Sequence, residues 1–249
     1  RRAIRWIIDL DTQGNCIGVQ DTSGDGKRGK EYPAVPRTAR AKNQGKAAEF
    51  LTGGVDSVFG LSPDSAKPKN SVKLCAKFED FWQQITDASA ATGHLDLKTL
   101  LHFKPRKGQV PSFLHLNAGK WVIKTASGTE TKFTGIFTFR VGSVLLMEDE
   151  KIRAYWRQVF ADTLAQQETE AEVGLCLITG NENVPLARTH APRIRNILGV
   201  GIDGTIVSFE KSAPAFSSYG KVQSYNAPCS ITATRAYSRA LQFLVDHQD

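Results

Sequence analysis

The sequence lacks any apolar run of the roughly 18 residues that a membrane-spanning helix requires, which argues against an integral membrane protein. It also has no C-x-x-C and no cysteine–histidine cluster with zinc spacing. We therefore expect no metal, no cofactor, and free, buried thiols in a reducing cytoplasm. The four cysteines are widely separated: Cys16, Cys75, Cys176 and Cys229.

No secretory signal peptide is recognisable at the start of the sequence. The chain opens on Arg1-Arg2 instead of Met, so we treat it as a fragment of a longer protein.

Catalytic motifs are missing as well. There is no H-E-x-x-H, no G-x-S-x-G and no G-x-x-x-x-G-K-[ST], and we expect no catalytic residue. "GVGIDG" (199–204) fits the dinucleotide-binding pattern G-x-G-x-x-G, but that site needs a helix directly afterwards, and "TIVSF" predicts a strand. Asp9 and Asp11 alternate on a predicted strand, which leaves a metal-dependent nuclease open as an alternative.

Acidic residues are scarce in three separate segments of a chain whose net charge is +7 and whose pI is near 9.3. Residues 27–46 contain one acidic residue, and residues 67–77 and 98–124 are basic and contain none. The acids gather instead at 148–172. Several basic segments in one chain favour a polyanionic partner such as nucleic acid.

The periodicity of apolar residues predicts a mixed α+β fold, with mostly antiparallel sheets and several packed amphipathic helices. A hairpin is expected first, with strands at 5–11 and 16–21 around a glycine turn. Further strands are predicted at 120–125, 132–140, 143–147 and 204–210, and a strand–turn–strand unit at 174–188. Helices are predicted at 78–90, 95–103, 148–167 and from an N-cap at Ser230 to Leu244.

The stretch "SYGKVQSYNAP" (218–228) fits neither the helical nor the strand period. It closes a segment that also carries Arg188, Arg193 and Arg195. Cations neutralise phosphates, and the amides of Gln and Asn donate and accept at base edges. The same composition also suits a loop whose amides bond to their own backbone, so both interpretations remain open.

Several blocks of sequence resemble a known family. They are "CLITGNENVPLARTHAPRI", "GVGIDGTIVSF" and "FSSYGKVQSYNAPCSITATRAYSRALQFL", preceded by "RWIIDLDTQGNCIGV" and "VPRTARAKNQGKAAEFLTGGVDSVFGL". In this order and spacing they resemble the N-terminal part of the large subunit of the type I-C CRISPR surveillance complex Cascade, the Csd family. The likeness is strongest over 174–244 and covers nearly the whole chain.

The resemblance implies that residues 1–249 form an N-terminal DNA-recognition domain, without the family's short lead and its helical C-terminal region. The family usually has Gln and Ser where this chain has Val200 to Asp203, so a DNA contact there would rest on backbone groups.

The resemblance further implies a non-catalytic subunit of an RNA-guided antiviral complex. Such a subunit recognises the protospacer-adjacent motif in double-stranded DNA and helps to start unwinding, while guide RNA reads the target by base pairing. The implied partners are double-stranded target DNA, CRISPR guide RNA, other Cascade subunits and a recruited helicase-nuclease that cuts. No membrane is implied.

Residue chemistry and loop placement give the candidate contacts. We expect Lys221, Gln223 and Asn226 to form one part of the DNA contact, and Lys67, Lys69 and Asn70 on the loop "SPDSAKPKN" to form another. A structural domain that meets guide RNA and neighbouring subunits without reading DNA is the second alternative. We expect four arginines to contact phosphates of DNA, or else guide RNA and neighbouring subunits: Arg37, Arg40, Arg193 and Arg195.

Overall fold

The structure of the chain is a computed structural model, and it describes residues 2–24, 29–36, 47–63, 71–195, 197, 204–209 and 220–247. The chain divides into two compact units, Arg1–Ala161 (unit 1) and Asp162–Asp249 (unit 2). Helices and mostly antiparallel sheets make up both, which confirms the predicted α+β class. None of the helices in the described ranges combines the length and apolarity that crossing a bilayer requires.

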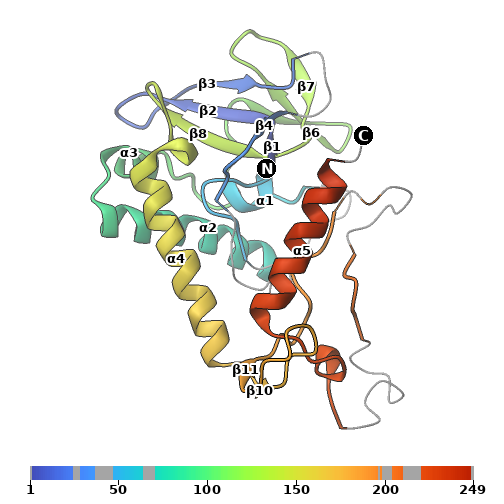
Figure 1. Cartoon of the computed structure of the whole chain (residues 1–249). Coiled ribbons are helices and arrows are strands. Elements are labelled where there is room, and N and C mark those ends of the chain that lie inside the picture. The colour runs from blue at the N-terminus through green and yellow to red at the C-terminus, as the bar shows by residue number, and fades with distance from the viewer. Residues whose placement is uncertain are drawn as a thin grey trace. The chain divides into compact units, whose positions relative to one another are not determined.

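The centre of unit 1 is a four-stranded sheet in the order β3-β2-β8-β9 (Figure 1). β2 pairs antiparallel with β3 and parallel with β8, although β8 lies far away in the sequence. The predicted hairpin is confirmed. The strands are β2 (Trp6–Leu10), β3 (Cys16–Asp21), β8 (Phe137–Val141) and β9 (Val144–Leu145).

β2 is suited to the middle of the sheet, because its sequence, "WIIDL", is apolar on one face and carries Ile7 and Asp9 on the other. Trp6, Ile8 and Leu10 are fully buried. The turn that follows is shaped by Asp11, whose Oδ1 accepts from the backbone N–H of Gln13 at 2.8 Å. Gly14 has a φ of +89° and lies so close to the helix Leu95–Phe103 that an added Cβ would stand 2.7 Å from the Thr99 carbonyl oxygen. Only glycine fits this turn without displacing its neighbour.

Helices α2 (Ser71–Thr92) and α3 (Leu95–Phe103) pack against this sheet (Figure 1). Trp82 is fully buried, and its ring centroid lies 6.2 Å from that of Phe139 on β8. Helix α4 (Glu150–Thr169) adds Trp156, which stacks on Phe50 at 4.6 Å. The helices predicted at 78–90, 95–103 and 148–167 are therefore confirmed, and their apolar faces form the core.

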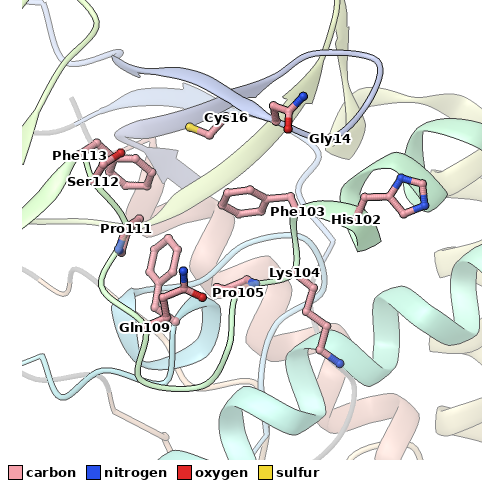
Figure 2. A pocket seen from close by; sticks show the side chains of 12 residues that line it. Gly14, Cys16, His102, Phe103, Lys104, Pro105, Gln109, Pro111, Ser112 and Phe113 are labelled. Carbon is pink, nitrogen blue, oxygen red and sulfur yellow. The ribbon is translucent and has the colours of Figure 1, made fainter.

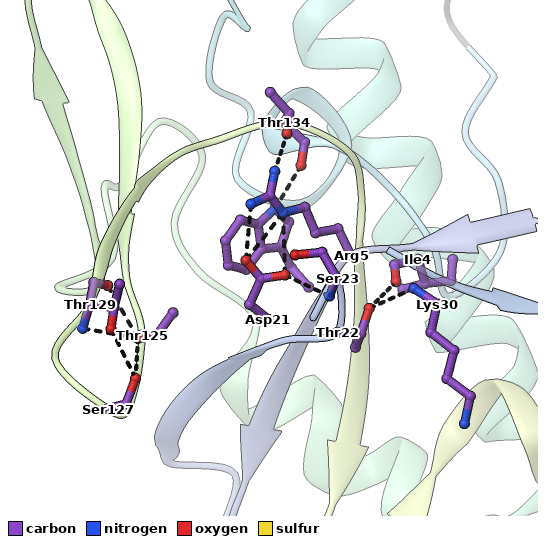
Figure 3. A network of polar contacts seen from close by, with 11 residues as sticks. Ile4, Arg5, Asp21, Thr22, Ser23, Lys30, Thr125, Ser127, Thr129 and Thr134 are labelled. Atoms are coloured by element: carbon purple, nitrogen blue, oxygen red, sulfur yellow. Dashed lines mark hydrogen bonds and ion pairs between the residues drawn. The ribbon is translucent and has the colours of Figure 1, made fainter. Parts of the chain in front are cut away.

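A network of polar contacts fixes the start of β2 (Figure 3). Arg5 Nη2 donates to Asp21 Oδ2 at 3.0 Å, and its Nη1 donates to Thr134 Oγ1 at 2.5 Å. The guanidinium also lies over the Trp6 ring, 4.7 Å from its centroid. Thr22 Oγ1 joins the adjoining strands by donating to the Ile4 carbonyl and accepting from Lys30 N. Arg5 thus ties the hairpin to the segment that leads into β8.

Smaller elements complete unit 1, and two of them differ from the prediction. Residues 132–140 do not form one strand, because Thr134 and Gly135 interrupt the pairing and the strand resumes at Phe137. Residues 143–147 begin as β9 but turn into a 3-10 helix, η2. The remaining elements are β1 (Arg2–Ile4), β4 (Lys30–Tyr32), α1 (Val55–Val58), β5 (Leu114–Asn117), β6 (Lys120–Lys124), β7 (Glu130–Lys132) and η2 (Leu146–Glu148).

Unit 2 is built around helix α5 (Ile231–Asp246), which confirms the last predicted helix. The strand–turn–strand unit at 174–188 is reduced to a short antiparallel pair, β10 (Val173–Gly174) and β11 (Val184–Pro185). The strand predicted at 204–210 is wrong over its described part: Gly204 forms an isolated bridge with Ile194, and residues 205–209 are irregular. The apolar run finds no partner strand within the described part of the chain.

Candidate nucleic-acid interface

The polar stretch that follows Gly220 is an ordered turn. Residues Gln223–Asn226 form a 3-10 helix, η4, and Gln223 has a φ of +51°, which is unusual for any residue other than glycine. Asn226 Nδ2 donates to the Gln223 carbonyl at 2.9 Å and to the Lys221 carbonyl at 3.3 Å. The Asn226 amide therefore holds the turn closed, which is the backbone-bonding role that the sequence left open.

Arg188 binds this turn from a segment far away in the sequence. Its Nε donates to Gln223 Oε1 at 2.8 Å, and its carbonyl accepts from Ser224 N at 3.3 Å. An arginine can only donate, so the amide oxygen of Gln223 faces Arg188 and the Nε2 group lies on the other branch of the amide. The structure thus brings Arg188, Gln223 and Asn226 together.

The role of Arg188 in holding Gln223 was missed by sequence reasoning. The residue was noted only as one cation in a basic segment, and no local pattern indicates contact across such a separation. Two exposed cations at the turn are suited to binding a polyanion, Lys221 and Arg188. The Arg188 guanidinium has further N–H donors besides the Nε–H that bonds to Gln223.

Arg193 and Arg195 flank a buried anchor. Ile194 is buried, and it exchanges two backbone hydrogen bonds with Gly204, of 2.7 and 3.0 Å. Gln242 on α5 accepts from Arg195 N at 2.7 Å and donates to the Arg195 carbonyl at 3.2 Å. The backbone of this segment is therefore fixed to α5, while Arg193 is exposed and Arg195 is half-buried.

Helix α5 provides the rigid base of the turn. Ser230 Oγ accepts from Ala233 N at 3.1 Å, the N-cap contact that the sequence predicted. His190 Nδ1 lies 2.6 Å from the Tyr237 hydroxyl on the same helix. Burial lowers the pKa of the His190 imidazole, because a charged ring would lose its hydration. His190 is thus kept as a neutral, buried partner of α5.

The remaining predicted contacts fall elsewhere. Lys67, Lys69 and Asn70, and likewise Arg37 and Arg40, lie outside the described residues. The segment Val200 to Asp203 lies outside them too.

Asp9 and Asp11 have other partners than a metal. Arg140 lies opposite Asp9 across the β2–β8 pair and donates to its Oδ1 at 2.7 Å and to its Oδ2 at 3.2 Å. Asp11 lies beyond the end of β2 and accepts from Asn15 N and Asn15 Nδ2, each at 2.9 Å. In the ranges that the structure describes, no group of three or more His, Cys, Asp or Glu is placed to hold a metal ion. The geometry gives the nuclease alternative no support.

A cavity of about 390 Å³ lies in unit 1 between the turn after β2 and the end of α3 (Figure 2). Phe103 and Phe113 form part of its wall, and Cys16, His102 and Lys104 line it as well (Figure 2). Its lining contains no Asp or Glu.

Comparison with known proteins identifies the assembly to which this chain contributes. The sequence profile of the family described as CRISPR-associated protein (Cas_Csd1) matches residues 1–249. The chain belongs to the Csd family of CRISPR-associated proteins. A search of curated proteins finds no match.

Membership of the Csd family places the protein among the large subunits of Cascade, which associate with CRISPR RNA and with other Cascade components. The blocks that carry the resemblance meet in unit 2: "LARTHAPRI" supplies Arg188 and Ile194, and "YGKVQSYNAP" supplies η4. The turn, Arg188 and α5 all come from these blocks.

Proposed function

We propose that this Csd protein recognises the protospacer-adjacent motif in double-stranded DNA and helps to start unwinding, as a subunit of a type I-C complex in the prokaryotic cytoplasm. Guide RNA then reads the target strand, and a recruited helicase-nuclease makes the cut. This division of labour is a general one: protein reads a short duplex motif, and base pairing reads the rest.

One observation carries the proposal: the hydrogen bond from Arg188 Nε to Gln223 Oε1, 2.8 Å long. It fixes which branch of the amide is the donor, so that Nε2 presents N–H groups of defined position. Base edges offer acceptors to such a donor in both grooves, at purine N7, guanine O6 and thymine O4 in the major groove and at adenine N3 and thymine O2 in the minor groove. The Arg188 guanidinium beside this amide is a charged donor, and charged donors make stronger hydrogen bonds than neutral ones.

The other predicted contacts take graded roles in this proposal. Lys221 and Arg193 neutralise phosphates and position the turn without reading sequence. Asn226 acts mainly on the shape of the turn, because its Nδ2 donates to the Lys221 and Gln223 carbonyls, and its Oδ1 is the part of the amide that can accept from a base. Lys67, Lys69 and Asn70 remain a proposed second reading element, and Arg37, Arg40 and Arg195 remain proposed phosphate or RNA contacts.

Two substitutions of Gln223 separate recognition of the DNA motif from the conformation of the turn. Gln223→Gly removes the amide at a φ of +51°, a conformation that glycine adopts easily, so the turn is retained. Gln223→Glu keeps the acceptor for Arg188 and removes the donor. Both variants should lose on the order of 1–3 kcal/mol of discrimination between motif and non-motif duplex in the assembled complex. Gln83→Ala, which removes an exposed amide from α2, serves as the matched control.

Two results would contradict the proposal. If both Gln223 variants discriminate between duplexes as the unsubstituted complex does, the turn does not read the motif. If a photocrosslinker at position 221 reacts with guide RNA or neighbouring subunits but never with duplex DNA, the protein is instead a structural domain without DNA readout. Protection of the guide RNA and complex assembly are measured in parallel to show that the complex is intact.

A further inference from the structure

Unit 2 contains an exposed apolar surface that no part of the proposed DNA contact uses. We define the apolar turn as Val173, Leu175, Leu177 and Ile178, whose exposed fractions are 62%, 46%, 62% and 54%. Large apolar side chains gathered on one short stretch are rarely left in water unless they bind something. The apolar turn adjoins β10 and faces away from the small core of Cys176, Cys229 and Ala233.

The apolar turn is held in a defined conformation. Cys176 is fully buried at its centre, and the Cys176 N–H donates to the Asn181 carbonyl at 2.9 Å. Gly180 N donates back to the Cys176 carbonyl at 2.8 Å. Leu177 N donates to the Pro228 carbonyl at 2.9 Å, and Ser230 N donates to Cys176 Sγ at 3.2 Å. These hydrogen bonds hold the backbone of the apolar turn with Cys176 buried and its neighbours exposed. Because the turn is already ordered, it would lose little conformational entropy on binding a partner.

The charged residues that flank the apolar turn in the sequence are of one sign. Between Arg157 and Arg188 the chain contains no lysine or arginine, although the whole protein is basic. Glu170, Glu172 and Glu182 are exposed on either side of the apolar residues. Phosphates would be repelled here, and the stretch from Glu170 to Ala187 has no aromatic residue on which a base could stack. Nucleic acid and anionic lipid are therefore poor partners for this surface.

We propose that the apolar turn is a protein-docking surface whose partner presents an apolar centre with a basic rim. A second copy of this chain does not fit, because a symmetric contact would place glutamates against glutamates. The partner is another protein subunit of the Cascade assembly, which family membership already requires to be present. This inference is independent of DNA recognition, since it concerns how the subunit joins the complex.

The test uses the intact protein, the remaining subunits assembled on guide RNA, and no DNA. The double variant Leu177→Ser/Ile178→Ser should weaken association by about tenfold or more, since apolar anchors at interface centres dominate binding. Glu172→Lys/Glu182→Lys should also weaken it, with an effect that shrinks at about 0.5 M salt, where charges are screened. Ile17→Ser, at an equally exposed apolar residue on β3 of unit 1, should leave association unchanged.

The outcomes are distinguishable. Unchanged association of both double variants would overturn the proposal. So would tighter association of the glutamate variant, because that result would place the surface against RNA. A photocrosslinking amino acid in place of Leu177 should react with a protein subunit, and reaction with guide RNA alone would contradict the inference. Thermal unfolding of each isolated variant shows whether it is folded, and the glutamate variant, which changes only exposed side chains, keeps the test decisive if the serine variant unfolds.

Discussion

Arg188 and Gln223 lie 35 positions apart in the sequence, and in the structure they are joined by a hydrogen bond of 2.8 Å. The bond connects the segment after β11 to the turn before α5. It converts a flexible glutamine into a donor of fixed orientation and leaves a guanidinium beside it. A cation and an amide held together in this way give one site that senses both phosphate charge and base identity.

Substitution of Arg188 should separate those two properties. Arg188→Lys keeps the charge but replaces a planar fork with a point charge, so Gln223 loses its fixed orientation. We expect motif preference to fall while affinity for non-motif duplex and its salt dependence stay the same. Arg188→Ala should lower both the motif preference and the affinity for non-motif duplex, and it should reduce the salt slope by about one unit. Binding isotherms over a range of salt concentrations measure the difference, and full discrimination in the lysine variant would contradict the positioning role.

The N-cap of α5 should contribute measurably to the stability of unit 2. Ser230 Oγ satisfies Ala233 N, so Ser230→Ala should cost about 0.5–2 kcal/mol. Ser230→Thr retains the hydroxyl and is the matched control. Hydrogen exchange of the amides in the first turn of α5 reports the local loss. Equal protection in the alanine and threonine variants would show that the contact does not stabilise the helix.

Asp9 should act on stability and not on DNA cleavage. Its carboxylate pairs with Arg140, and both side chains are partly buried, so a double-mutant cycle of Asp9→Asn and Arg140→Gln should give a coupling of about 1 kcal/mol. Purified protein incubated with DNA and magnesium or manganese should show no cleavage that depends on Asp9. Cleavage that disappears in Asp9→Asn would restore the nuclease alternative.

His190 should make the stability of unit 2 depend on pH. Burial lowers its pKa in the folded state, while the unfolded chain keeps a value near 6.5, about that of free histidine. Below that value the unfolded chain binds more protons than the folded one, so stability should rise with pH up to about 6.5 and then level off.

Unfolding free energies of the wild type and of His190→Gln, measured between about pH 5 and 7.5, should differ in slope by at most about 1.4 kcal/mol per pH unit. The variant keeps a polar side chain but cannot titrate. Parallel slopes for the two proteins would mean that folding does not shift the pKa of His190.

Local signals in the sequence predicted most of the elements correctly. The apolar face of α2, the glycine turn after β2 and the Ser230 N-cap are each set by residues within a few positions of one another. The predictions failed where a distant partner decides the outcome. Residues 205–209 have the composition of a strand but no neighbouring strand in the described chain, and the parallel pairing of β2 with β8 has no local signature.

The same limit applies to the candidate site. Composition identified the stretch around Gln223 as polar, cationic and rich in amides, and it left two interpretations open. In the structure the amide donors of Asn226 bond to the Lys221 and Gln223 carbonyls, and Gln223 has a partner that spacing alone could not indicate. Which groups of a loop are already bonded depends on tertiary contacts, and these decide what remains for a ligand.

The parallel pairing of β2 with β8 also bears on how the protein is made. Trp6 and Phe137 are partners in the sheet, so in a nascent chain leaving the ribosome the free edge of β2 in the first hairpin stays unpaired until Phe137 has been translated. That edge, flanked by the apolar side chains of "WIIDL", is the natural place for a chaperone to bind during synthesis. Co-expression with chaperones should therefore raise the yield of folded protein more than slower induction alone.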